Sequence, residues 1–135
     1  MTYYRKKSFI FLLLALTLTT LVYFPGLKGG FLFDDFPNLG DMTRYGDITN
    51  WENAKQFIFN GFSGPTGRPI SLATFWLTAS SWLEGNAFPF KLINLFIHLF
   101  CGVILFFINK LLLKEYKYEE YKSVWIALFS TSLWL

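Results

Sequence analysis

The chain has 135 residues, of which 53% are hydrophobic, 21% aromatic and only 16% charged, and its net charge is +3. Soluble domains carry about 25% charged residues, and aromatic side chains concentrate at bilayer interfaces, so the composition favours a membrane protein. The lysines lie beside apolar runs instead of forming one basic stripe, which argues against a nucleic-acid partner. A single cysteine, Cys101, gives neither a disulfide framework nor a metal cluster.

The first apolar run covers residues 8–24 and follows a basic start that contains Arg5, Lys6 and Lys7. At about 1.5 Å per helical residue, this run is close to the lower length limit for crossing a hydrocarbon core of about 30 Å. A cleaved signal peptide has a similar pattern, but no small-residue cleavage site ends the run. We therefore favour an uncleaved transmembrane helix, and the positive-inside rule predicts a cytoplasmic N-terminus.

Residues 25–90 are expected to form a large external loop that contains two short helices. Thr49 and Glu52 have the spacing of a capping box, which predicts a helix over about 50–59 that stops at Asn60-Gly61. The apolar side chains that share one face of this helix are Trp51, Ala54, Phe57 and Ile58.

The second short helix is predicted over 69–83, because Pro69 is well accepted in a first helical turn. Its hydroxyl side chains recur at three- and four-residue steps and form one polar stripe: Ser71, Thr74, Thr78 and Ser81. The segment is short for a membrane crossing, so we expect an amphipathic external helix, with a crossing as the alternative.

The remaining chain predicts a second transmembrane helix over 92–113, a cytoplasmic loop over 114–122 and the start of a third transmembrane helix over 123–135. Lysines in and around the loop favour its cytoplasmic placement. The expected fold class is thus all-α: one polytopic membrane module over 1–135, with two to three transmembrane helices. Because thirteen residues cannot cross a bilayer as a helix, we expect further helices downstream in a longer protein.

Asp34 and Asp35 are the leading candidates for chemistry. Successive residues of an extended segment point to opposite sides, so one carboxylate could face a site while the other orients the backbone or holds a divalent cation. The aromatic residues beside the pair, which would strip water from a carboxylate and favour a general base, are Phe31, Phe33 and Phe36. The alternative is an exposed pair of acids in a turn.

Four further polar residues are candidates. Arg68 precedes a helix start, which suits a phosphate, although an interfacial arginine pairing with lipid headgroups is equally expected. Lys91 is a candidate for the same phosphate or lipid contact, and its alternative role is that of an interfacial lysine that marks the membrane boundary. Asn94 and His98 lie inside an apolar span and are functional candidates for that reason, but a hydrogen bond to a helix absent from this chain is the favoured interpretation. One histidine without a second ligand at metal spacing is weak evidence for a metal site, so the sequence leaves metal binding open.

The order of three segments, 31–38, 67–72 and 90–99, resembles the beginning of membrane GT-C glycosyltransferases. The resemblance is carried by Asp34-Asp35, by Arg68-Pro69 and by Asn94-x-x-x-His98. It is strongest to the protein O-mannosyltransferase-like group, which includes transmembrane proteins that carry tetratricopeptide repeats. The likeness covers only the first helices of that fold.

The resemblance implies a glycosyltransferase that moves a sugar from a polyprenyl-phosphate donor to a protein hydroxyl. Asp34 or Asp35 would be the catalytic acid or base, and Arg68 would lie near the donor phosphate. The implied partners are membrane lipid, the donor, a protein acceptor and the missing downstream helices, in a bacterial inner membrane or an ER membrane. The chain alone is expected to be inactive, and the alternative is a small integral-membrane interaction protein without catalysis.

Overall fold

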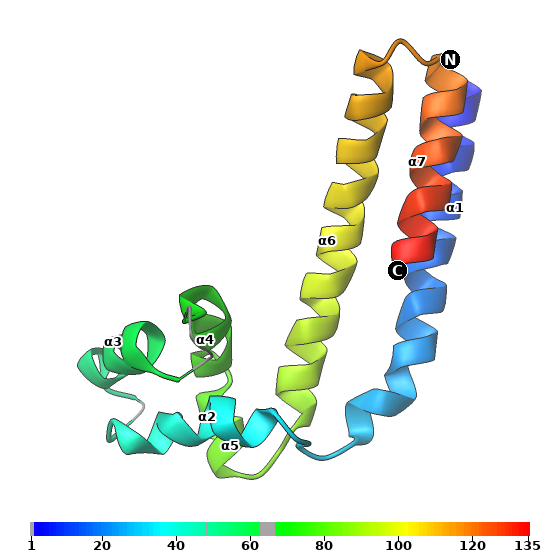
Figure 1. Cartoon of the computed structure of the whole chain (residues 1–135). Coiled ribbons are helices and arrows are strands. Elements are labelled where there is room, and N and C mark those ends of the chain that lie inside the picture. The colour runs from blue at the N-terminus through cyan, green and yellow to red at the C-terminus, as the bar shows by residue number, and fades with distance from the viewer. Residues whose placement is uncertain (1, 48, 63–66) are drawn as a thin grey trace. The chain divides into compact units, whose positions relative to one another are not determined.

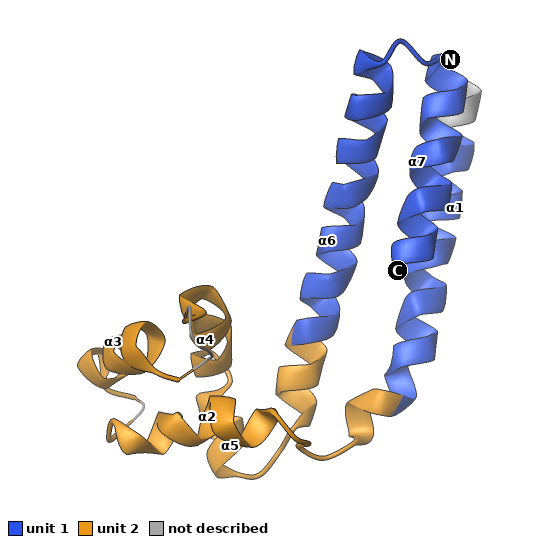
Figure 2. Ribbon diagram, in the orientation of Figure 1, with its two compact units in different colours: residues 1–25, 94–135 blue, residues 26–93 orange. Residues whose placement is uncertain are grey.

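The computed structural model describes residues 2–47, 49–62 and 67–135, and all the regular elements in these ranges are helices (Figure 1). The all-α part of the predicted fold class is therefore confirmed. In chain order the helices are α1 (Thr2–Tyr23), the 3₁₀ helix η1 (Phe24–Lys28), α2 (Asp35–Arg44), α3 (Trp51–Asn60), α4 (Pro69–Trp76), α5 (Ala79–Leu83), α6 (Phe88–Glu115) and α7 (Glu120–Trp134). They divide into two compact units, the first formed by residues 1–25 and 94–135 and the second by residues 26–93 (Figure 2).

The first unit contains α1, α7 and most of α6. Two segments, Lys6–Lys28 and Phe88–Glu115, are long and apolar enough to cross a membrane, with mean hydropathies of 2.1 and 2.2. Only 17% of each span is buried, whereas the core helix of a soluble protein would be mostly covered. The side chains that hold the unit together are Leu12, Phe106, Ala127 and Leu128, with Leu16, Leu113 and Trp125 packed against them.

Several polar groups of the first unit are hydrogen-bonded within it. The Thr17 hydroxyl donates to the Leu13 carbonyl of the preceding helical turn at 2.8 Å, and other threonines of α1 do the same. Between helices, Asn109 Nδ2 of α6 donates to Ser130 Oγ of α7 at 2.9 Å. This bond joins two apolar helices at one defined register.

The second unit packs α2–α5 and the first turns of α6 around one core. Phe57 and Met42 are only 2% and 1% exposed. The buried side chains of this core are Leu39, Met42, Phe57, Ile58, Leu72, Ala79 and Phe90. The predicted inner face of 50–59 is thus found for Ala54, Phe57 and Ile58, whereas Trp51 is 55% exposed and meets the ring of Trp76 at 5.7 Å.

The extended conformation expected for Asp34 and Asp35 is wrong. Asp34 has helical dihedral angles (φ −70°, ψ −12°), and Asp35 is the first residue of α2. Two buried side chains one turn apart, Leu39 and Met42, attach this helix to the core of the second unit. Tertiary burial therefore overrides the turn signal of the Asp-Asp-Phe-Pro sequence.

The predicted capping box is also wrong, although the helix it announced exists. Asp47 Oδ1 accepts from both the amide (2.9 Å) and the hydroxyl (2.8 Å) of Thr49, so that hydroxyl is engaged outside the helix. Asn50 is the N-cap instead, and its side chain accepts from the Glu52 amide at 2.9 Å. The predicted stop is confirmed: α3 ends at Asn60 and Gly61 follows as its C-cap.

The single helix predicted over 69–83 is two helices. Pro69 does begin α4 as predicted, but both the amide and the hydroxyl of Thr78 bond to the Phe75 carbonyl, at 2.9 and 3.0 Å. These three-residue bonds tighten the chain, and Thr78 leaves helical geometry (φ −116°, ψ 17°). The resulting helices have eight and five residues, and neither is long enough to cross a bilayer.

Three helices, α1, α6 and α7, extend beyond their predicted boundaries. Helix α1 begins at Thr2 instead of residue 8, and α6 covers Phe88–Glu115 instead of 92–113. The loop predicted over 114–122 shrinks to 116–119. Lys117 takes a positive φ of 60° there, and the Tyr118 amide donates to the Leu113 carbonyl at 3.1 Å, which closes the end of α6 as a Schellman-type turn.

Candidate functional site

The two adjacent carboxylates have different surroundings. Asp35 is half-buried, and its Oδ2 accepts from the Leu32 amide at 2.8 Å while the Asp35 amide donates to the Leu32 carbonyl at 2.9 Å. This reciprocal pair closes the turn that leads into α2. Asp35 therefore orients backbone, which is one of the two roles expected for the pair.

Asp34 is the available carboxylate. Its side chain is exposed, gives no capping bond to α2 and has no hydrogen-bond or ionic partner among the described residues. Only its backbone carbonyl is engaged, by the amide (3.2 Å) and side chain (2.7 Å) of Asn38. Because Asp34 is exposed, the expected loss of hydration among aromatic rings does not occur within this chain.

An aromatic cluster supports the turn from one side. The Phe31 ring packs edge-on against Trp82 at 4.8 Å and Phe90 at 5.5 Å, and Phe36 meets Trp82 at 6.2 Å. Phe33 does not join them: it is 87% exposed, with a positive φ of 39°. That conformation costs a non-glycine residue about 1–2 kcal/mol. The turn thus holds a strained, outward-facing phenylalanine directly before Asp34.

The two cationic residues among the predicted site residues, Arg68 and Lys91, differ in the same way. Arg68 is exposed at the N-cap of α4, and its guanidinium has no partner among the described residues. Lys91 is half-buried, and its Nζ donates to the Gly26 carbonyl at 3.2 Å. A Cβ on Gly29 would lie 2.8 Å from that Nζ, so Gly29 leaves the room that the lysine occupies. Lys91 therefore holds backbone, whereas Arg68 is free to bind an anion.

Asn94 and His98 belong to the first unit, whereas the other four predicted site residues belong to the second. His98 Nε2 donates to the Leu135 carbonyl at 3.2 Å, and its ring stacks on Trp134 at 4.5 Å and meets Tyr23 at 5.7 Å. The partner of His98 thus lies in this chain and not in a missing helix. Asn94 is exposed and has no side-chain partner among the residues described.

Within the second unit, no hydrogen bond or ion pair of the described part joins Asp34, Asp35, Arg68 or Lys91 to one another. The described residues also include no group of three or more His, Cys, Asp or Glu side chains that could hold a metal ion. Cys101 is an exposed free thiol.

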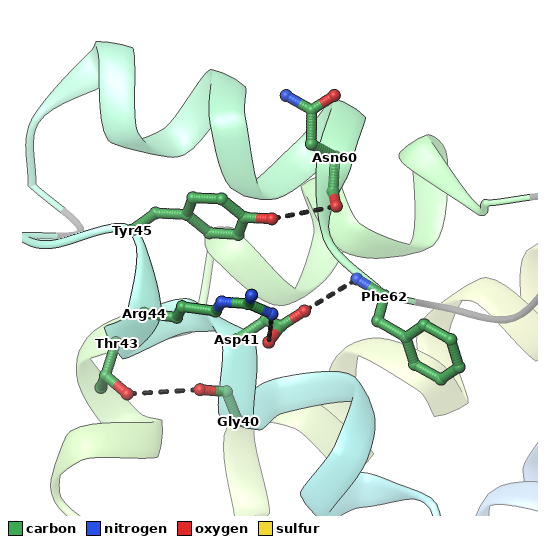
Figure 3. A network of polar contacts seen from close by, with 7 residues as sticks. All are labelled: Gly40, Asp41, Thr43, Arg44, Tyr45, Asn60 and Phe62. Atoms are coloured by element: carbon green, nitrogen blue, oxygen red, sulfur yellow. Dashed lines mark hydrogen bonds and ion pairs between the residues drawn. The ribbon is translucent and has the colours of Figure 1, made fainter.

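Sequence reasoning missed Asp41, which is only 17% exposed in its side chain. Its carboxylate accepts from the Phe62 amide at 2.9 Å and lies 3.6 Å from the Arg44 guanidinium (Figure 3). Beside it, the Tyr45 hydroxyl donates to the Asn60 carbonyl at 2.9 Å. These bonds attach α2 to the end of α3, and no sequence spacing announces them because Asp41 and Phe62 are 21 positions apart.

Asp47, which lies in the turn before α3, has a lowered pKa. The backbone amide of Thr49, and then its hydroxyl, stabilise the charged carboxylate and lower the Asp47 pKa from its usual 3.8, while slight burial acts in the opposite direction. Because Asp47 lies in the tight turn before α3, the lowered pKa reflects stabilisation of that turn and gives no sign of a catalytic role.

Comparison of the chain with protein-family models, with curated proteins and with solved structures finds no match.

Proposed function

We propose that this chain is the N-terminal membrane module of a GT-C-like glycosyltransferase, which moves a sugar from a polyprenyl-phosphate donor to a protein hydroxyl. Two membrane-length segments flank the second unit in the sequence, and basic residues precede the first of them. By the positive-inside rule the N-terminus is cytoplasmic, so α2–α5, which follow the first span, lie on the external side. There an exposed acid would meet both a lipid-borne donor and a water-soluble acceptor.

The observation that carries the proposal is the free carboxylate of Asp34 beside the engaged one of Asp35. Asp34 takes the proton from the acceptor hydroxyl while the hydroxyl oxygen forms its bond to the anomeric carbon of the sugar. The bond between that carbon and the phosphate oxygen breaks, and polyprenyl phosphate leaves with the electron pair. Arg68, whose guanidinium is also unpaired, binds the phosphate as its charge develops.

The experiment compares Asp34→Asn with Asp35→Asn in the full-length protein, in membranes supplied with radiolabelled polyprenyl-phosphate hexoses. Loss of a general base costs about 10²–10⁴-fold in rate, so Asp34→Asn abolishes label transfer to protein and leaves thermal stability unchanged. Asp35→Asn lowers stability, and it lowers transfer only as far as folded protein is lost. Full transfer by folded Asp34→Asn protein contradicts the catalytic assignment.

A second candidate, a membrane interaction protein without catalysis, is favoured by Asn94. A polar side chain in an apolar span, without a partner among the described residues, suits a hydrogen bond to another membrane helix. In that case Asn94→Leu lowers association of the chain with its partner helix in a membrane two-hybrid or cross-linking assay, while Asp34→Asn has no effect. Association unchanged by Asn94→Leu contradicts this candidate.

A further inference from the structure

A cavity of about 410 Å³ lies in the first unit between the last turns of α6 and the first turn of α7. On the α6 side it is lined by Phe107, Lys110, Leu111 and Lys114, and its other wall is formed by Tyr118, Glu120 and Ser123. Two lysines therefore belong to a lining whose surface is mostly apolar. The function proposed above makes no use of this cavity.

The two helices that line the cavity are joined to each other at two places. The turn at Lys117 joins them at one end, where the buried Ser123 hydroxyl donates to the Glu119 carbonyl at 3.1 Å. Farther along the helices, Asn109 Nδ2 donates to Ser130 Oγ at 2.9 Å. The space between these two attachments is thus part of the fold and not a fraying end.

The lysines of the cavity are not held in ion pairs within the described part of the chain. Lys110 is half-buried and Lys114 exposed, and neither forms an ion pair within the described residues. Glu120, the one acid of the lining, pairs with neither of them. Lys122, by contrast, lies outside the lining and pairs with Glu119 at 3.3 Å. Two lysines beside apolar side chains favour a ligand that combines an anionic group with an apolar part.

We propose that this cavity binds one anionic glycerophospholipid of the phosphatidylglycerol type. The phosphate pairs with Lys110 and Lys114, and an acyl chain lies along Phe107 and Leu111. A free anion would use the lysines alone, whereas the apolar part of the lining suits a lipid. Basic pockets between transmembrane helices at their cytoplasmic ends bind anionic headgroups in this way.

Glu120 sets the kind of headgroup. Its carboxylate repels a second phosphate but accepts hydrogen bonds from hydroxyl groups such as those of glycerol. The cavity therefore selects a single phosphodiester with hydroxyl groups over a multiply phosphorylated headgroup. This inference rests on the membrane placement of α6 in the proposed function, but it does not depend on glycosyl transfer, because lipid binding is measured without donor or acceptor.

The test uses native mass spectrometry of the full chain in neutral detergent with added phosphatidylglycerol or phosphatidylcholine. We expect one phosphatidylglycerol to be retained and phosphatidylcholine not to be. Each lysine near an anionic headgroup contributes about fivefold in affinity, so the double variant Lys110→Gln/Lys114→Gln weakens retention about 30-fold. The matched control, Lys117→Gln/Lys122→Gln, removes the same charge from the same segment outside the lining and retains the lipid.

If both double variants weakened phosphatidylglycerol retention equally, the lipid would be attracted by the overall positive charge of the segment, and the proposed site would be overturned. Leu111→Trp fills the apolar part of the cavity without a change of charge, and we expect it to weaken retention as well; unaltered retention by this variant contradicts the acyl-chain contact. Inorganic phosphate at millimolar concentration should not displace the lipid. Displacement would assign the lysines to a free phosphate and overturn the lipid.

Discussion

Replacing Asp35 with alanine tests the turn that presents Asp34. The change removes one charge-assisted hydrogen bond, the 2.8 Å contact between Asp35 Oδ2 and the Leu32 amide. Such bonds contribute about 1.5–3 kcal/mol, and the half-exposed position of Asp35 places the value at the low end, at about 1.5 kcal/mol. Local opening of the turn should then become roughly tenfold more frequent.

Amide hydrogen exchange, measured by NMR on the full chain in detergent micelles, reports this opening at the Leu32 amide. In Asp35→Ala the Leu32 amide exchanges about tenfold faster, and protection at Phe57 in the core is unchanged. Asp34→Ala is the matched control, since its side chain has no partner within the described residues, and it leaves the Leu32 amide as it was. Acceleration of the same size in both variants would show that Asp35 does not close the turn.

The strained backbone of Phe33 allows a second version of the hydrogen-exchange experiment, in a Phe33→Gly background. Glycine adopts positive φ without the penalty that phenylalanine has at 39°, so Phe33→Gly makes the turn less dependent on Asp35. In the Phe33→Gly background we expect Asp35→Ala to accelerate exchange of the Leu32 amide by less than it does in the wild-type chain. Full additivity of the two substitutions would mean that strain and carboxylate act separately.

Three further outcomes follow from single contacts. Gly61→Ala places a Cβ against the Phe57 carbonyl, so we expect a loss of about 1–3 kcal/mol in the thermal unfolding of the full chain; an unchanged melting temperature contradicts this packing. Thr131 Oγ1 is buried without a hydrogen-bond partner among the described residues, so Thr131→Val raises stability by about 1 kcal/mol, and a lower melting temperature would show that the hydroxyl has a partner. The bonds from Thr49 to Asp47 stabilise the fold above the usual Asp pKa, and this stabilisation is lost as pH falls through the lowered native pKa of Asp47. In an NMR titration, Thr49→Ala should raise the Asp47 pKa only part of the way to 3.8, because the backbone amide remains; a return to the full value contradicts the leading role of that amide.

The long helices could be predicted from the sequence because their signal is local. Unbroken apolar runs indicate α1, α6 and α7 without any tertiary information, and only their ends were misplaced. Helix α2 could not be predicted in this way. Pro37 suggested a turn, yet it falls in the first helical turn, where a missing amide costs little. The helix forms because Leu39 and Met42 are buried against residues much later in the chain.

The sequence also could not predict which of Asp34 and Asp35 is hydrogen-bonded to backbone and which has no side-chain partner among the described residues. Both carry the same carboxylate, and only the direction of the Leu32 amide decides which one is engaged. The break at Thr78 is similar: the residue fits the hydroxyl stripe of a continuous helix equally well. Side-chain bonds to nearby carbonyls compete with helical bonds by small margins, and the surrounding packing decides between them.

The bond between Lys91 Nζ and the Gly26 carbonyl has a consequence for how the second unit folds. It joins the residue where the chain enters this unit to one just before the chain leaves it, so the unit is a closed loop. Closing a flexible loop of this length costs about 4 kcal/mol in chain entropy. If α1 and α6 are already paired in a bilayer when α2–α5 fold, that cost is met during insertion. The Lys91 hydrogen bond then only has to hold together two loop ends that the membrane has already brought close.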